Sequence, residues 1–158
     1  MKKLTALIFL IYGNSLFSQD CSFKSDTVYI PSDKKVLTSE FVEAHLKNKS
    51  IFQLVKAPNK KIYVKFIVTE NLYFGKIDQL EVKSGKRSFY VKDAMHYQYD
   101  KYRGYYLFEI YPNYVITLRD EGLTGIKYGK AETDYTKSDC HNVKLISKCF
   151  YESIAPKK

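Results

Sequence analysis

The three cysteines and three histidines are the side chains through which this sequence could do chemistry. They are Cys21, Cys140, Cys149, His45, His96 and His141. No two of the histidines stand at the spacing of a metal site, and the chain contains no glycine-rich phosphate loop or nucleophile elbow. The sequence therefore predicts no metal, no cofactor and no identifiable catalytic residue.

Cys140 is the thiol whose position suggests reactivity. It falls in the first turns of a predicted helix and directly precedes His141, and a thiol near a helix N-terminus can serve as a nucleophile. However, the side chains of adjacent helix residues point about 100° apart, so the imidazole of His141 is not placed to accept the thiol proton. We therefore expect a structural role for Cys140.

Cys21 is expected to form a disulfide with one of the other two cysteines. On a single helix Cys140 and Cys149 lie about 13.5 Å apart along the axis, which is far beyond disulfide reach. These two cannot pair with each other, whereas Cys21 can pair with either, and both pairings remain open. Gln19 and Asp20 precede Cys21, where a lipid-modified cysteine has small residues, so we expect no lipid anchor.

Residues 1–18 have the pattern of a bacterial secretory signal peptide. Lys2 and Lys3 precede a largely apolar run that is too short to span a bilayer, and Ser18 fits the cleavage site. Cleavage there leaves residues 19–158, a usual length for one domain. We expect this domain to be exported and to be periplasmic or secreted, where disulfides persist.

Lysine dominates the charge of the chain. The sequence has 26 Lys and Arg against 17 Asp and Glu, a formal net charge of +9, and only three of the basic residues are arginine. For an exported chain of this charge the expected partner is an acidic protein or an anionic or sugar-bearing envelope polymer, and not nucleic acid. No second apolar run has membrane length, so we expect no transmembrane segment in the mature chain.

Tyrosine is the most distinctive residue type, with 15 Tyr and no Trp. It is densest at 96–106, "HYQYDKYRGYY", where cations lie between the rings. Such interleaving suits binding to protein side chains or to sugars. The candidate binding residues are Tyr97, Tyr99, Lys101, Tyr102, Arg103 and Tyr105. The alternative interpretation is that these rings only cover a sheet, because tyrosine is a preferred strand residue.

Alternating apolar residues predict strands through most of the chain after residue 61. The predicted strands cover 62–69, 80–82, 89–91, 106–110, 114–118 and 123–128. The second and third flank a short glycine-containing turn and predict a hairpin, and the fourth and fifth predict another around Pro112. Strands joined by such short turns pair antiparallel, since a parallel crossover needs about a dozen residues.

Two helices are predicted to flank this sheet. Thr38 suits the N-cap of a short N-terminal helix, whose apolar face would contain Phe41, Val42, His45 and Leu46. Thr136 and Asp139 form a capping-box pattern at the start of a C-terminal helix. Its amphipathic stripe contains Val143, Ile146, Phe150 and Ile154. The predicted fold is one α+β domain, a twisted, hairpin-rich antiparallel sheet of about six to eight strands with the C-terminal helix packed on one face.

Two classes of function fit these features. The first is a non-enzymatic binding protein, such as an envelope factor or an inhibitor or immunity-type partner, that acts through a surface rich in Tyr and Lys. The second is an exported enzyme, such as a hydrolase of envelope polymers, whose catalytic residues converge only in three dimensions. The first is favoured because no catalytic motif occurs in the sequence. A cleft lined by histidine and carboxylates would favour the enzyme.

Overall fold

The computed structural model describes residues 21–30, 35–69, 77, 79–92, 94–98, 100 and 103–156. The predicted signal peptide at residues 1–18 lies outside the described residues. The described chain forms two antiparallel sheets and two helices, which confirms the predicted α+β class and twisted antiparallel sheet.

The larger sheet has six strands in the order β1-β2-β3-β4-β8-β7. Their bounds are Lys24–Ile30 for β1, Lys35–His45 for β2, Ile51–Lys56 for β3, Ile62–Thr69 for β4, Arg103–Ile110 for β8 and Met95–Gln98 for β7. The smaller sheet has the order β10-β9-β5-β6. Its bounds are Ala131–Asp134, Gly125–Tyr128, Gln79–Ser84 and Arg87–Lys92 in that order. The ten strands of the described residues exceed the predicted six to eight, because the predicted strands did not include β1, β2, β3 and β7 of the larger sheet or β10 of the smaller one.

The main core lies between the two sheets and the helices. The predicted alternation in β4 is confirmed, since one of its faces contributes Ile62, Val64, Phe66 and Val68 to this core. The predicted hairpin at 80–91 is also confirmed, because Leu80 pairs with Val91 and Val82 pairs with Phe89 between β5 and β6.

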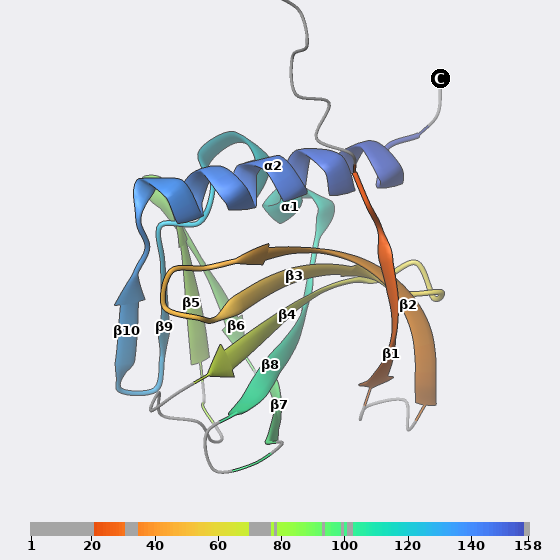
Figure 1. Cartoon of the computed structure of the whole chain (residues 1–158), viewed down its shortest axis with the longest axis horizontal. Coiled ribbons are helices and arrows are strands. Elements are labelled where there is room, and N and C mark those ends of the chain that lie inside the picture. Colours follow the sequence, from red (N-terminus) through yellow and green to blue (C-terminus); the bar gives the residue numbers. More distant parts are fainter. Residues whose placement is uncertain are drawn as a thin grey trace, which may run out of the picture.

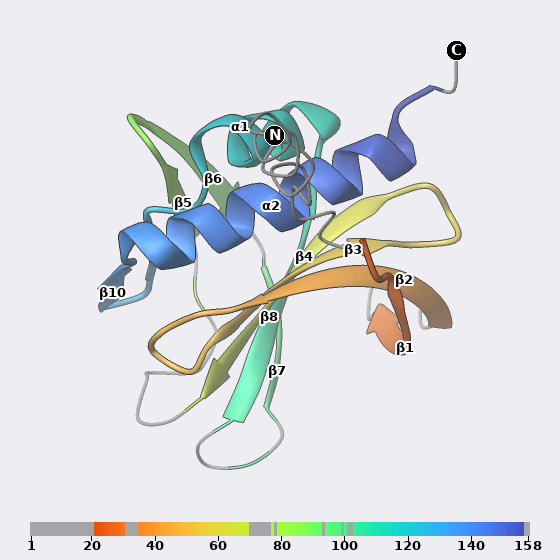
Figure 2. The ribbon, with the colours of Figure 1, turned by 45° about the horizontal axis from the view of Figure 1, so that its top comes forward.

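Helix α2, Lys137–Ile154, lies along one side of the molecule with the strands on the other (Figure 1). Its capping box forms as predicted: Thr136 Oγ1 accepts from Asp139 N, and Asp139 Oδ2 accepts from Thr136 N at 3.0 Å. Val143 and Phe150 are completely buried against the core. The amphipathic C-terminal helix is therefore confirmed, and it packs on α1, β2 and β3 (Figure 2).

The predicted N-terminal helix is wrong, because the segment after Thr38 belongs to strand β2. Both faces of this strand are covered: Val42 and Ala44 enter the main core, while Phe41 enters a second cluster on the opposite face. Neighbouring residues on opposite faces are therefore both apolar, and the apolar positions of this strand have the same three-and-four spacing as those of a helix.

The predicted second hairpin is also wrong, because residues 112–121 form helix α1, Pro112–Glu121, instead of a returning strand. Pro112 occupies its first turn, where the missing N–H would have no partner in any case. Val115 and Leu118, three residues apart, are both buried. Strand β8 pairs instead with β4 and β7.

The larger sheet has a second apolar cluster on the face turned away from α2. It contains Phe41, Val55, Ala57, Tyr63, Tyr105 and Leu107. Lys65 lies in the same region with only 6% of its surface exposed, and its Nζ is 3.6 Å from Asp26 Oδ2. Asp26 is on β1, separated from β4 by two strands that a flat sheet would space at about 4.8 Å each. Such a contact requires the sheet to curl, and Figure 1 shows the β1–β2 end bending away from α2.

Candidate functional site

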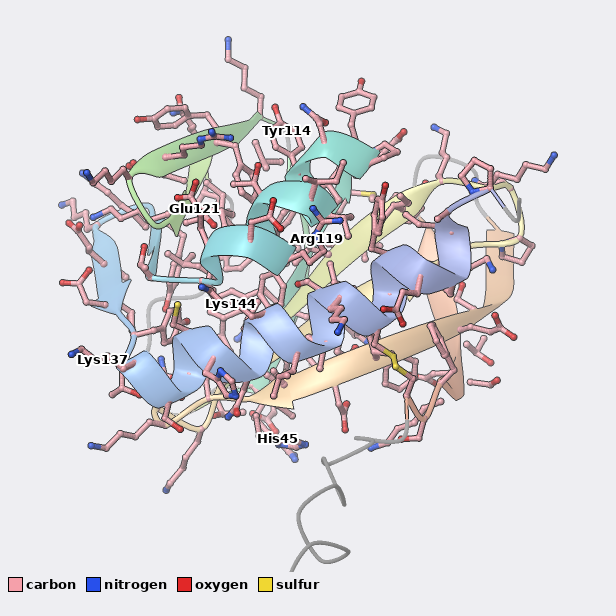
Figure 3. All side chains as sticks on the ribbon, turned by 90° about the horizontal axis from the view of Figure 1, so that it is seen from above. His45, Tyr114, Arg119, Glu121, Lys137 and Lys144 are labelled. Carbon is pink, nitrogen blue, oxygen red and sulfur yellow. A yellow bond between two sulfur atoms is a disulfide. The ribbon has the colours of Figure 1, made fainter. Side chains whose placement is uncertain are left out.

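The disulfide joins Cys21 to Cys149, with their Cα atoms 5.7 Å apart. The bond ties the segment before β1 to the second half of α2, and Figure 3 shows it as a yellow bond beside that helix. Phe23 packs on Phe150 next to it, with ring centres 6.3 Å apart. Of the two pairings that the sequence left open, the one with Cys149 is therefore formed, and Cys140 is a free thiol.

Cys140 is partly buried in the first turns of α2. Its Sγ donates a hydrogen bond to the carbonyl oxygen of Glu121 at 3.1 Å. The neighbouring His141 is exposed and, among the described residues, makes no hydrogen bond with this thiol. The thiol therefore connects the end of α1 to α2, and His141 is not placed to activate it.

The predicted tyrosine site is partly described, at the β7–β8 end of the larger sheet. Tyr97 and Tyr105 are register partners on β7 and β8, and their rings stack with centroids 5.5 Å apart. The residue Tyr97 is 49% exposed, whereas Tyr105 is only 7% exposed. Tyr99, Lys101 and Tyr102 lie outside the described residues. Of the predicted rings, the structure brings Tyr97 and Tyr105 together and presents Tyr97 to solvent.

Tyr105 is held from both of the strands that flank β8. Tyr97 reaches it from β7, and the ammonium group of Lys65 lies over its ring from β4, 4.8 Å from the centroid. A cation over an aromatic face is attracted by the ring quadrupole. The exposed Tyr97 ring therefore rests on a buried ring that is itself fixed by a buried cation.

Arg103 stands at the start of β8 beside these rings and is fixed by Asp100. Its Nε and Nη2 approach Asp100 Oδ2 at 2.8 and 2.7 Å, and its backbone N donates to Asp100 Oδ1 at 2.9 Å. The side chain nevertheless remains 65% exposed. Because two donors of the guanidinium are already engaged by Asp100, its position is set before any partner binds.

A histidine–carboxylate pair that the sequence analysis did not predict lies on the side of α2 opposite α1, where Figure 3 labels His45. His45 Nε2 is 3.2 Å from Glu43 Oε1, and both side chains line a cavity of about 260 Å³ next to the disulfide. The signal was present in the sequence as the spacing of two, which places both residues on one face of a strand. On the predicted helix, by contrast, residues two apart would point to nearly opposite sides.

Glu43 in this pair is held as a carboxylate. Burial opposes its ionisation, but hydrogen bonds from Lys24, Gln53 and His45 outweigh this effect and lower the pKa of its carboxyl. Lys24 Nζ lies 2.5 Å from Oε1, and Gln53 Nε2 donates to Oε2 at 2.9 Å. Among the described residues, the only hydrogen-bond partner of the His45 side chain is Glu43. No hydroxyl or thiol among the described residues is bonded to the imidazole, as it would be in a Ser-His or Cys-His pair.

The described part of the chain contains no group of three or more His, Cys, Asp or Glu that could hold a metal ion. Neither of the described helices is long and apolar enough to cross a membrane. In comparisons with known proteins, the chain matches no family model, no curated protein and no solved structure.

Proposed function

We propose that this chain is an exported, non-enzymatic binding protein that captures an acidic partner protein. It does so through the Tyr97 surface, which consists of Tyr97 and Arg103 with Tyr105 beneath. The observation that carries the proposal is the stacking of the half-exposed Tyr97 ring on the buried Tyr105 ring. Tyr99, Lys101 and Tyr102 are assigned to the same surface by the sequence alone.

The composition of this surface is that of an interface hot spot. Tyrosine and arginine are, with tryptophan, the residue types enriched at interface hot spots, and side chains that are rigid before binding lose less entropy. Stacking fixes Tyr97, and Asp100 fixes Arg103, so little side-chain entropy remains to be lost. Without residues 1–18, which contain Lys2 and Lys3 and no acidic residue, the net charge is 9 − 2 = +7, and this charge favours a partner that is negatively charged.

The alternative is an exported hydrolase, and the Glu43–His45 pair beside a cavity is the observation that favours it. A hydrolase would need the imidazole to activate a hydroxyl, a thiol or a water. The described residues instead place His45 against Glu43, and Lys24 occupies the same Glu43 oxygen. This arrangement supports charge pairing between β1 and β2 more than turnover.

Capture from a cell-envelope extract of the native organism tests the proposal. The immobilised protein should retain a protein partner, and the double variant Tyr97→Ala/Arg103→Ala should lose it. The matched control is Tyr90→Ala/Arg87→Ala, because Tyr90 is 56% exposed and Arg87 is 71% exposed on β6, in the other sheet. Capture of a protease-resistant polymer, or equal loss by both double variants, would reject the proposal.

A further inference from the structure

A second site, distinct from the Tyr97 surface, lies at the C-terminal end of α2. A cavity of about 580 Å³ forms there between the β3–β4 turn, the start of α1 and the last turn of α2. Figure 2 shows these three segments converging at that end of the helix. The volume is within the range of about 300 to 1,000 Å³ that is usual for small-molecule sites.

The lining of this cavity is apolar with cations at its margin. Isoleucines, prolines and alanines supply most of the wall, including Ile62, Ile116 and Ile154. Lys56 and Lys60 are the charged residues that line it, and no carboxylate does. Neither lysine has an ion-pair partner among the described residues. Glu40 stands opposite Lys56 in the register of β2 and β3 but forms no ion pair with it. An apolar wall with these two lysines is complementary to an apolar chain that carries a negative group.

The walls of the cavity are fixed by local hydrogen bonds. In the β3–β4 turn, Lys60 N donates to Ala57 O at 3.0 Å and Ala57 N donates to Lys61 O at 3.1 Å. At the end of α2, Ala155 N donates to Tyr151 O at 2.9 Å. The Tyr151 ring packs under the Arg119 guanidinium at 4.7 Å. A ligand would therefore enter a site that is already formed, which lowers the entropic cost of binding.

We propose that this cavity binds a free amphipathic acid, a single unbranched acyl chain with an anionic head. The chain occupies the space between Ile62, Ile116 and Ile154, and the head lies between Lys56 and Lys60. We propose a free acid and not the surface of a bilayer, because three segments of the fold enclose the cavity and leave room for a single chain. The site does not depend on the Tyr97 surface, so either proposal can fail alone.

Lys60 allows its charge to be removed without loss of structure. Its φ is 65°, in the left-handed region that glycine adopts without penalty. Lys60→Gly therefore preserves the turn and should leave stability equal or improved while it removes the cation. Ala155 follows α2 in an extended conformation that any residue adopts, so Ala155→Trp can fill the cavity without breaking the helix.

Calorimetric titration with laurate below its micelle concentration tests the proposal. The purified protein should bind one laurate per chain, and dodecyltrimethylammonium should bind at least about tenfold more weakly. Lys56→Ala/Lys60→Gly should weaken laurate by about tenfold, because each partly exposed ion pair contributes modestly. Lys92→Ala/Lys130→Ala is the control and should change nothing. Ala155→Trp should abolish binding of both probes.

Four results would overturn the proposal. The first is no laurate binding by a folded protein, and the second is equal affinity for the anionic and cationic probes. The third is laurate binding that the Ala155→Trp variant retains. Binding to vesicles of phosphatidylcholine and phosphatidylglycerol without binding of monomeric laurate would assign the lysines to a lipid surface and would also reject the proposed ligand.

Discussion

Lys65 on β4 lies 3.6 Å from Asp26 on β1, across two intervening strands of the same sheet. The Lys65 side chain is 7% exposed and also contacts the Tyr105 ring, while Asp26 is 52% exposed. The buried ammonium group of Lys65 therefore contacts both Asp26, which the curl of the sheet brings close, and the Tyr105 ring, on which Tyr97 stacks.

This arrangement predicts that the bulk of Lys65 matters more for stability than its charge. Lys65→Met keeps the apolar stem and should change the free energy of unfolding by less than about 1 kcal/mol, because the half-exposed Asp26 stays hydrated without its partner and such ion pairs contribute little. Lys65→Ala should cost about 2 to 3 kcal/mol through the cavity that it leaves. Urea denaturation measures both, and equal losses would show that the charge itself is required.

Asp139 predicts a dependence of stability on pH. Burial opposes its ionisation, but hydrogen bonds from Thr136 and from Lys47 N lower the pKa of its carboxyl. A carboxyl with a lowered pKa in the folded state stabilises fully above its unfolded pKa of about 4, and this stabilisation is lost as pH falls through the folded value. Asp139→Ala should cost about 1 to 3 kcal/mol at pH 7 and less at pH 2.

Urea midpoints between pH 2 and pH 7 measure this difference. Asp134→Ala, at an exposed position on β10, is the matched control and should stay close to the wild type throughout. Part of the pH dependence should persist in Asp139→Ala, because the pKa of Glu43 is lowered as well. A constant gap between Asp139→Ala and the wild type across this range would contradict the predicted role of ionised Asp139.

The disulfide should be a major source of stability. Cys21 and Cys149 are 128 residues apart, and closing a loop of this length contributes about 3 to 5 kcal/mol. Cys149→Ser should lose this contribution. Cys140→Ser should change stability by less than about 1 kcal/mol, because a hydroxyl can still donate to the Glu121 carbonyl. Thermal unfolding with and without reductant checks both, and only Cys140→Ser should respond to reductant as the wild type does.

The apolar stripe of α2 predicts unequal costs along the helix. Phe150 is completely buried and packs on Phe23, so Phe150→Ala should lose about 3 to 5 kcal/mol. Lys148 is exposed on the same helix, and Lys148→Ala should lose less than about 0.5 kcal/mol. Guanidinium titration of the two variants decides, and similar midpoints would mean that the stripe does not carry the packing.

The sequence predicted those elements whose apolar residues follow a single period. In α2 this period is three to four, and in β4 it is two, because one face carries only Ile62, Val64, Phe66 and Val68 while the other face, although also buried, includes Lys65 and Thr69 among its residues. In β2 the two faces meet different clusters, with Val42 in one and Phe41 in the other. Its pattern therefore fits both a strand and a helix, and only pairing with β1 and β3 decides between them.

The sequence predicted which segment contains the candidate site, but not which side chains share a surface. The density of tyrosine at 96–106 pointed to Tyr97 and Arg103, because this density can be read from one stretch of the chain. The burial of Tyr105 depends on Lys65 and Tyr97, which come from different strands, and no local pattern contains that information. Glu43 and His45 stayed hidden because their common face exists only once the segment is a strand.

The most direct test of the proposed function is the affinity of the captured partner for two double variants, measured by surface plasmon resonance. Tyr97→Ala/Arg103→Ala should bind at least about tenfold more weakly than the wild type, while remaining folded with a loss of about 1 to 2 kcal/mol. Tyr90→Ala/Arg87→Ala should keep wild-type affinity. Equal affinities for the two variants, or lost stability with unchanged binding by the first, would contradict the assignment of the Tyr97 surface as the binding site.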